Sequence, residues 1–261
     1  MPGTPSGQIG QGIGNQTQLG QSGGTMTDQL YVGLVGVQQD KEQRAAYDAF
    51  FKEQNPAKKI QLGDEFLRKY PKSPLDERVD FGMMNAYRAQ QDWKNAFRFA
   101  DSALALQPDD VDVLATVGWT IPHVLNANDP DADQELNKAE TYAKRAIEAL
   151  SKLSKPRELS EEQFADARAK RSFQSHSALG LVYFRRQDYD NSAKELALAT
   201  KDNATPDPTD LFILGVDLQN LNRWSDAADV FRGCSQIAGA LQARCKQAAD
   251  AAKARAEQSK P

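Results

Sequence analysis

Apolar residues recur at helical spacing from residue 40 onward. Tyr47 and Phe50 lie on one face of a 3.6-residue period, which predicts an amphipathic helix. Asn55-Pro56 then stops this helix and starts another, because proline is tolerated in the first turn of a helix and not in its interior. Leu30–Val37 is apolar and partly β-branched, but no second segment of that kind exists to pair with it as a strand. The pattern therefore predicts an all-α protein.

Two neighbouring segments of the chain repeat the same pattern. Gly180 and Gly215 are 35 residues apart, and each is followed nine residues later by an aromatic residue, Tyr189 or Trp224. This period is close to that of repeats built from a helix, a turn and a second helix. Such hairpins cannot bury their apolar faces alone, so the period predicts a stack in which each hairpin covers the next.

The same pattern extends toward the N-terminus. One hairpin has its turn at Asp92-Trp93 and ends at Gln107-Pro108, and the next begins near Leu114. Pro122 is expected to kink or end the first helix of this third hairpin, and residues 126–133 are expected to form a polar loop. We expect about nine extra residues between the helices of this unit.

The sequence after residue 150 predicts further helices. A second insert, residues 151–159, precedes Ser160 and Gln163, whose spacing matches a capping box. The helix that this box opens is expected to run to about Arg186. An alanine-rich helix over residues 240–258 is expected to cap the last hairpin, whose apolar face no further repeat covers.

At this point the sequence resembles a known family. The residues that carry the resemblance are the aromatic, acidic, small and proline positions of the second hairpin, namely Tyr87, Asp92, Trp93, Ala96, Ala103 and Pro108. Their spacing is similar to that of tetratricopeptide repeats. The resemblance implies an all-α, right-handed α-solenoid of about five helical hairpins plus a C-terminal capping helix, over residues 38–261. Residues 1–37 are expected to be a disordered Gly/Gln-rich tail with a short apolar segment that lies against the first helices.

The first helices of such repeats line a concave groove that binds extended peptides or partner helices. Carried over position by position, the resemblance places one set of residues in that groove: Arg78, Phe81, Asn85, Arg88, Trp119, His123, Gln174, Ser177, Leu181, Phe184, Arg185, Phe212, Val216, Gln219 and Asn220. About half of the aromatic residues among them are expected to pack against neighbouring helices instead.

One branch of this family clamps a C-terminal carboxylate with a Lys, Asn and Arg set. Asn85 matches that set, but Phe81 and Thr116 stand where it has Lys and Asn. We therefore predict a non-catalytic scaffold that binds a protein or peptide segment through an apolar groove. The alternative is a structural or self-associating subunit of a cell-envelope assembly.

Charge and hydropathy narrow the classes of partner. The chain of 261 residues has a formal net charge of −4 and no cluster of Lys and Arg, which argues against nucleic-acid binding. Its longest apolar run, Leu30–Val37, is far shorter than the roughly 20 residues that span a bilayer. We predict no nucleic-acid partner, no transmembrane segment and no cofactor, and leave the oligomeric state open.

The sequence has few candidate metal-binding or catalytic residues. The acidic and amide residues Asp129, Asp131, Asp133, Glu135, Asn137 and Glu140 have the spacing of a calcium loop, but Gln134 replaces the glycine of its turn. Capping of the following helix is the preferred interpretation. His176 is expected to lie in the core and His123 on the groove, and no catalytic motif or metal-binding set is present.

Cys234 and Cys245 are the only cysteines. Helices joined near Ala238-Gly239 would bring them close to disulfide range, and two free buried thiols are the alternative. A pair of this kind points weakly to an oxidising compartment. The location is expected to be periplasmic or extracytoplasmic if a leader precedes this sequence, and cytoplasmic otherwise.

Overall fold

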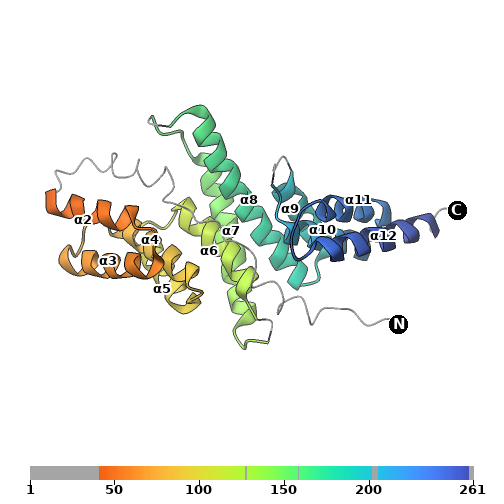
Figure 1. Ribbon diagram of the computed structural model, residues 1–261, viewed down its shortest axis with the longest axis horizontal. Helices are drawn as coiled ribbons and strands as arrows, with labels where there is room; N and C mark the ends of the chain where they lie inside the picture. The colour runs from red at the N-terminus through yellow and green to blue at the C-terminus, as the bar shows by residue number, and fades with distance from the viewer. Residues whose placement is uncertain (1–40, 127, 158, 202–204, 259–261) are drawn as a thin grey trace. The chain divides into compact units, whose positions relative to one another are not determined.

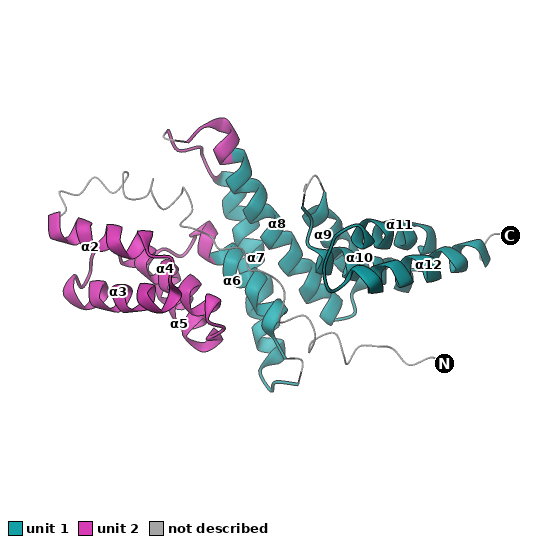
Figure 2. Cartoon of the chain, viewed as in Figure 1, with its two compact units in different colours: residues 1–17, 114–152, 165–261 teal, residues 18–113, 153–164 magenta. Residues whose placement is uncertain are grey.

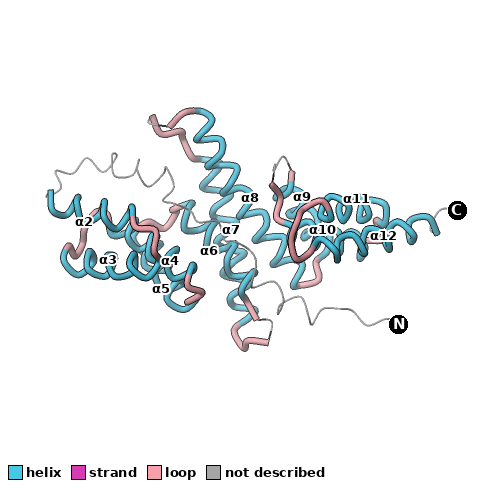
Figure 3. The backbone as a smooth tube through the Cα atoms, viewed as in Figure 1, coloured by secondary structure: helices cyan, strands magenta, loops and turns pink. Residues whose placement is uncertain are grey.

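The computed structural model describes residues 41–126, 128–157, 159–201 and 205–258. The tail expected over residues 1–37 lies outside them. Eleven helices and no strand occur in this part of the chain (Figure 1; Figure 3). Successive helices pair as hairpins, and a single helix follows the fifth pair, which confirms the predicted all-α architecture of helical hairpins with a final helix.

The chain divides into two compact units (Figure 2). The described residues of unit 2 fall within 18–113 and 153–164, and those of unit 1 within 114–152 and 165–261. Unit 2 contains α2 (Lys41–Lys52), α3 (Pro56–Lys69), α4 (Asp76–Ala89) and α5 (Trp93–Leu106). Unit 1 contains α7 (Ala132–Lys152), α9 (Tyr189–Thr200), α10 (Pro208–Asn220), α11 (Trp224–Ser235) and α12 (Gln242–Gln258). It also contains all but the first turn of α6 (Val111–Val124) and α8 (Glu161–Arg185).

Side-chain caps form at the helix N-termini that the sequence predicts. Asn55 accepts a hydrogen bond from the Lys58 N–H at the start of α3. At the start of α8 the Gln163 N–H donates to Ser160 Oγ, and the Ser160 N–H donates to Gln163 Oε1. This reciprocal pair is the predicted capping box, and it satisfies two N–H groups that have no partner within the helix.

Three hairpins have the same type of turn between their helices. Gln91, Gln187 and Asn222 each have a positive φ, of 59°, 63° and 58°. In each turn the next residue donates its N–H to a carbonyl five residues back, at 2.8 to 3.0 Å. This is the hydrogen bond of a Schellman motif, which satisfies a carbonyl at the end of the first helix. The same local geometry therefore closes the second, fourth and fifth hairpins.

The third hairpin differs from the expectation. Pro122 lies inside α6, which ends two residues later, and α7 begins at Ala132. The predicted polar loop over 126–133 is therefore too long by two residues at its end. The extra sequence of this unit mostly lengthens α7 to 21 residues, because its alanine and leucine positions continue the helical period past the usual repeat length.

Each unit has its own core. In unit 2, Tyr47, Phe50 and Phe66 are almost fully buried. The ring centres of Phe50 and Phe66 lie 6.4 and 6.2 Å from that of Tyr47. In unit 1 the core of the last hairpins gathers around Leu196, Leu218 and Phe231. No helix among the described residues is long and apolar enough to cross a bilayer.

Candidate functional site

The predicted groove positions of unit 2 lie along α4. Arg78 and Phe81 are 5% exposed, whereas Asn85 and Arg88 are half-buried. The Arg78 guanidinium carbon lies 5.5 Å from the centre of the Phe81 ring. Two of the four predicted residues are therefore part of the packing of this unit, and the other two retain exposed surface.

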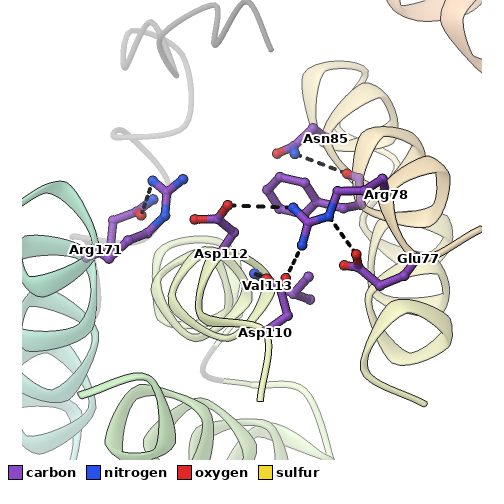
Figure 4. Close-up of polar contacts among 9 residues, drawn as sticks. Glu77, Arg78, Asn85, Asp110, Asp112, Val113 and Arg171 are labelled. Carbon is purple, nitrogen blue, oxygen red and sulfur yellow. Dashed lines mark hydrogen bonds and ion pairs between the residues drawn. The ribbon is translucent and has the colours of Figure 1, made fainter. Parts of the chain in front are cut away.

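Arg78 is surrounded by carboxylates (Figure 4). Its Nε donates to Glu77 Oε2 at 2.6 Å, one of its terminal nitrogens donates to Asp110 Oδ2, and the other lies 3.7 Å from Asp112 Oδ2. Asp110 also accepts a hydrogen bond from the Val113 N–H at 2.9 Å, which caps the start of α6. The cluster therefore ties α4 to the first turn of α6 within unit 2.

Burial sets the protonation of this cluster. It raises the pKa of Glu77 to about 8, although the neighbouring Arg78 acts in the opposite direction. It also raises the pKa of Asp110. A buried ion pair stabilises a fold only when its partners are complete, because an unpaired buried charge is costly. We conclude that Arg78 has a structural part in unit 2.

Arg88 has a different environment. One terminal nitrogen donates to Asn85 Oδ1 at 2.7 Å, and Asn85 Nδ2 donates to the Phe81 carbonyl at 3.1 Å. The Nε of Arg88 is buried and makes no hydrogen bond within the described chain. Burial lowers the pKa of Arg88 to about 10.

In unit 1, α6 carries Trp119 and His123 one turn apart. Their rings lie 4.0 Å apart, and His123 Nδ1 is 2.6 Å from the Trp119 carbonyl oxygen. Trp119 is 8% exposed, packs against Ala178 and Leu179 of α8, and its indole N–H makes no hydrogen bond to a described residue. His123 is half-buried.

The end of α8 lies against the end of α6. Arg185 donates to the carbonyls of Pro122 and Leu125, at 2.8 and 3.3 Å. Carbonyls at a helix C-terminus need such donors, so Arg185 joins two helices of unit 1. Burial lowers the pKa of Arg185. Its neighbour Phe184 is half-buried and meets Tyr189 edge-on at 6.3 Å.

On α10, Phe212 is 9% exposed, and its ring centre lies 5.6 Å from that of Phe231. The guanidinium carbon of Arg244, on α12, is 5.0 Å from the Phe212 ring centre. Val216, one turn after Phe212, is half-buried. Within unit 1, Trp119 of α6 packs against Leu179 of α8, and Ser177 of α8 donates to Asp210 of α10, so these three helices are neighbours.

The remaining predicted groove positions are mostly polar or buried. Leu181 belongs to the core of unit 1, Gln174 lies 3.4 Å from Arg171, and Asn220 donates to the Val216 carbonyl. Gln219 is half-buried.

Besides the carboxylates around Arg78, three further buried carboxyl groups were not predicted from the sequence. Ser177 donates to Asp210 at 2.9 Å, and Ser102 donates to Asp80 at 2.5 Å. Asp217 Oδ2 lies 2.5 Å from Ser192 Oγ, which also lies 2.9 Å from the Gly180 carbonyl. An Asp inside the apolar run of α10 was a visible signal, since an unpaired charge is rarely buried.

Burial dominates the titration of these groups. It raises the pKa of Asp217 to about 7, that of Asp80 to about 6, and that of Asp210 well above its usual range, while the serine hydrogen bonds act in the opposite direction. Ser192 has one hydroxyl proton and two oxygen partners. That proton can be donated to the Asp217 carboxyl or to the Gly180 carbonyl.

The acidic insert does not form a calcium loop. Asp133, Glu135, Asn137 and Glu140 lie within α7, so the alternating turn geometry of such a loop is replaced by helix. Glu140 pairs with Arg186 and, at 2.5 Å, with Lys144. Within the described residues no cluster of three or more His, Cys, Asp or Glu has a geometry that could hold a metal ion.

His176 is only partly in the core. Its Nδ1 lies 2.7 Å from Glu195 Oε2, which joins α8 to α9, and its side chain is 18% exposed. The expectation of a core histidine is therefore corrected to a half-buried one, because its polar ring finds a carboxylate at the edge of the helix pair.

Cys234 and Cys245 form a disulfide, with 5.7 Å between their Cα atoms. Both residues are fully buried. The bond joins the last turn of α11 to the first turn of α12. Cys245 and Ala252 are the buried residues of α12, so the disulfide is a main attachment of this helix.

In the described part of unit 1, two surface hollows are lined by none of the predicted groove residues. One of about 310 Å³ lies between α7 and α8 and is lined by Ile147, Leu150 and Arg168, among others. The other, of about 510 Å³, lies between the start of α11 and the end of α12, beside Trp224 and Lys253.

The chain has matches among solved structures. No family model matches the sequence, and no curated protein matches it. Among solved structures, a tetratricopeptide repeat protein from Parabacteroides merdae matches with 13% sequence identity and a TM-score of 0.28, over 86% of this chain and 99% of that chain. The described helices themselves identify the chain as an all-α protein of successive helical hairpins.

Proposed function

We propose that the protein is a non-catalytic scaffold that binds a protein or peptide segment on the first helices of its hairpins. The observation that carries the proposal is the set formed by Trp119, His123, Phe184 and Val216, which we call the A-helix face of unit 1. These residues lie on α6, α8 and α10 of unit 1, and three of them keep exposed surface.

The chemistry of this face suits recognition of an apolar segment. Aromatic side chains supply much of the binding energy at protein interfaces, at a low cost in side-chain entropy. Arg185 and Phe212 support the face from within, through the α6 carbonyls and the Phe231 ring.

The test uses the full chain as an immobilised bait. Substituting Phe184→Ala together with Val216→Ser is expected to abolish capture of specific partners from a lysate of the native host, as identified by mass spectrometry. These positions are chosen because both are half-buried, whereas Phe81 and Phe212 are buried and their loss would damage the fold. Circular dichroism checks that the double variant remains helical.

Leu198→Ala is the matched control, because Leu198 is an apolar residue 50% exposed on α9. An unchanged set of partners in the double variant would refute binding through this face. A size that grows with concentration in sedimentation, for the chain alone, would instead favour the self-associating subunit.

A further inference from the structure

The last helix lies beside the A-helix face. α12 begins at Gln242, 34 residues after α10 begins at Pro208, and this distance is the period of helix-turn-helix repeats. It therefore occupies the place that the first helix of a sixth hairpin would have. The guanidinium carbon of Arg244 lies 5.0 Å from the centre of the Phe212 ring, and Phe212 precedes Val216 of the A-helix face by one turn of α10.

A shared core connects α12 to this face. Phe184 of α8, Val216 of α10 and Ala248 of α12 are partly buried and pack against the same cluster of buried residues. That cluster contains Phe212 and Cys245. A displacement of α12 would therefore uncover part of the cluster and change the surface that a partner segment meets, because a close-packed core has no spare contacts to replace those of a lost helix.

The disulfide is the strongest attachment of α12. No large apolar side chain of this 17-residue helix is buried, since its buried residues are Cys245 and Ala252. Burial of an alanine side chain stabilises a helix far less than burial of a leucine or a phenylalanine. Cys245 is bonded to Cys234 of α11 and directly follows Arg244 in the sequence. The bond therefore fixes the part of α12 that covers Phe212.

We propose that α12 is a fourth helix of the partner-binding face and that the Cys234–Cys245 disulfide holds it there, so that partner binding depends on the redox state of this bond. The inference rests on the proposed function and adds its regulation. The occupant of the enlarged face is the apolar segment proposed above, because Ala248 and the Phe212 ring under Arg244 continue the apolar surface of the A-helix face.

A dithiol supplies the electrons for the change. Its thiolate attacks one of the two sulfur atoms, the bond between Cys234 and Cys245 breaks, and the sulfur that leaves takes a proton. The second thiol of the reductant then displaces the other cysteine, so that both cysteines end as thiols and the reductant ends as a disulfide. Both cysteines are fully buried, so the attack requires a local opening of α12.

The first experiment needs no partner. In the full chain, the methyl signals of Val216 are assigned by their loss in Val216→Ala and followed by NMR while dithiothreitol reduces the disulfide. A change in these signals, with those of Leu106 unchanged, is the expected result. Leu106 is a suitable reference because it is exposed and belongs to unit 2. Unchanged Val216 signals in the fully reduced chain would overturn the inference, even if a partner is captured.

The second experiment measures affinity for the partner that the immobilised chain identifies. Complete reduction is expected to weaken binding about fivefold or more, which is the usual size of coupling between two sites. Cys234→Ala combined with Cys245→Ala is expected to bind with the same lowered affinity whether or not dithiothreitol is present. If the reductant weakens binding by this double variant as much as by the native chain, it acts elsewhere and the inference is overturned.

Arg244→Ala tests whether α12 belongs to the face. It is expected to weaken binding by the oxidised chain and to have no further effect in the variant without Cys234 and Cys245, because a released α12 no longer places Arg244 over Phe212. Arg232→Ala, at an exposed arginine of α11, is the matched control and is expected to leave the affinity unchanged. Equal losses from Arg244→Ala in both backgrounds would refute positioning by the disulfide.

The outcomes separate this inference from the proposed function. An affinity that reduction leaves unchanged would overturn the part of α12 while the A-helix face stands. An oxidised chain that captures no specific partner would instead defeat the proposed function, and this inference with it.

Discussion

At the scale of single residues, polar groups in the core determine much of the behaviour of this protein. Arg78 is a clear case, because its sequence position suggested a groove and its surroundings are a buried cluster of carboxylates. The side chain serves the fold of unit 2, and its removal has consequences that a surface arginine does not have.

Arg78→Met is expected to lower the free energy of unfolding by about 3–5 kcal/mol, since it leaves Glu77 and Asp110 buried without a cation. Urea unfolding followed by circular dichroism measures the change at neutral pH. Arg232→Ala, which breaks an exposed pair with Asp229, is expected to cost less than about 1 kcal/mol. Equal losses in the two variants would show that the buried cluster contributes no more than a surface pair.

At the scale of helices, close approach depends on residues without side chains. A Cβ added at Gly180 would lie 2.5 Å from Leu196 Cγ and 3.3 Å from the Leu196 backbone nitrogen. Leu196 is fully buried, so neither atom can move away easily. The contact between α8 and α9 therefore requires glycine at this position.

Gly180→Ala is expected to destabilise the protein by about 1–3 kcal/mol through overpacking, despite the better helix propensity of alanine. Gly233→Ala is the matched control, because it also lies in a helix and its added Cβ would meet nothing within 4 Å. That variant is expected to be more stable by up to about 1 kcal/mol. Thermal and urea unfolding compare the two, and a shift of the same sign in both would contradict the packing argument.

The disulfide is expected to stabilise mainly α12. Reduction of Cys234–Cys245 is expected to remove about 3 kcal/mol of stability in the chain-entropy model. Hydrogen exchange is expected to rise first in α12, because this helix buries little else. Cys234→Ala combined with Cys245→Ala should show the same exchange with and without reductant. If α12 exchanges equally before and after reduction of the native protein, the bond does not hold the helix.

At the scale of the whole molecule, buried carboxyl groups in both units give stability an unusual pH dependence. Asp80 lies in unit 2, and Asp210 and Asp217 lie in unit 1. Because burial raises the pKa of each above its value in the unfolded chain, the folded state binds more protons than the unfolded state over the interval between the two values.

Stability is therefore expected to be greater at pH 5 than at pH 8. The contribution of Asp217 is fully present below its unfolded pKa of about 4 and is lost as the pH rises through its folded pKa of about 7. Asp217→Asn is expected to flatten this dependence by on the order of 1–2 kcal/mol. The amide oxygen can still accept a hydrogen bond from Ser192, so the variant keeps this contact.

Urea unfolding at pH 5 and pH 8 measures the effect. Asp190→Asn serves as the control, because Asp190 lies on the exposed side of α9 and pairs with Lys194. An identical pH dependence in Asp217→Asn and the unsubstituted chain would contradict a protonated Asp217 in the fold.

The amino-acid sequence by itself determined the local structure of this protein. The helices, the capping box at Ser160 and the shared turns after α4, α8 and α10 follow from residues a few positions apart, where hydrogen bonds and helical periodicity act. The pairing of hairpins was predictable for the same reason, since each helix has one apolar face to cover.

Only the tertiary structure decided what the predicted site residues do. Arg78 is paired, Arg185 serves the end of α6 and Arg88 has no carboxylate partner among the described residues, although all three occupy groove positions in the repeat pattern. The difference arises because burial and electrostatic partners come from residues distant in sequence. The same is true of Asp217, whose pKa is raised by burial and lowered by a hydrogen bond from Ser192 of α9.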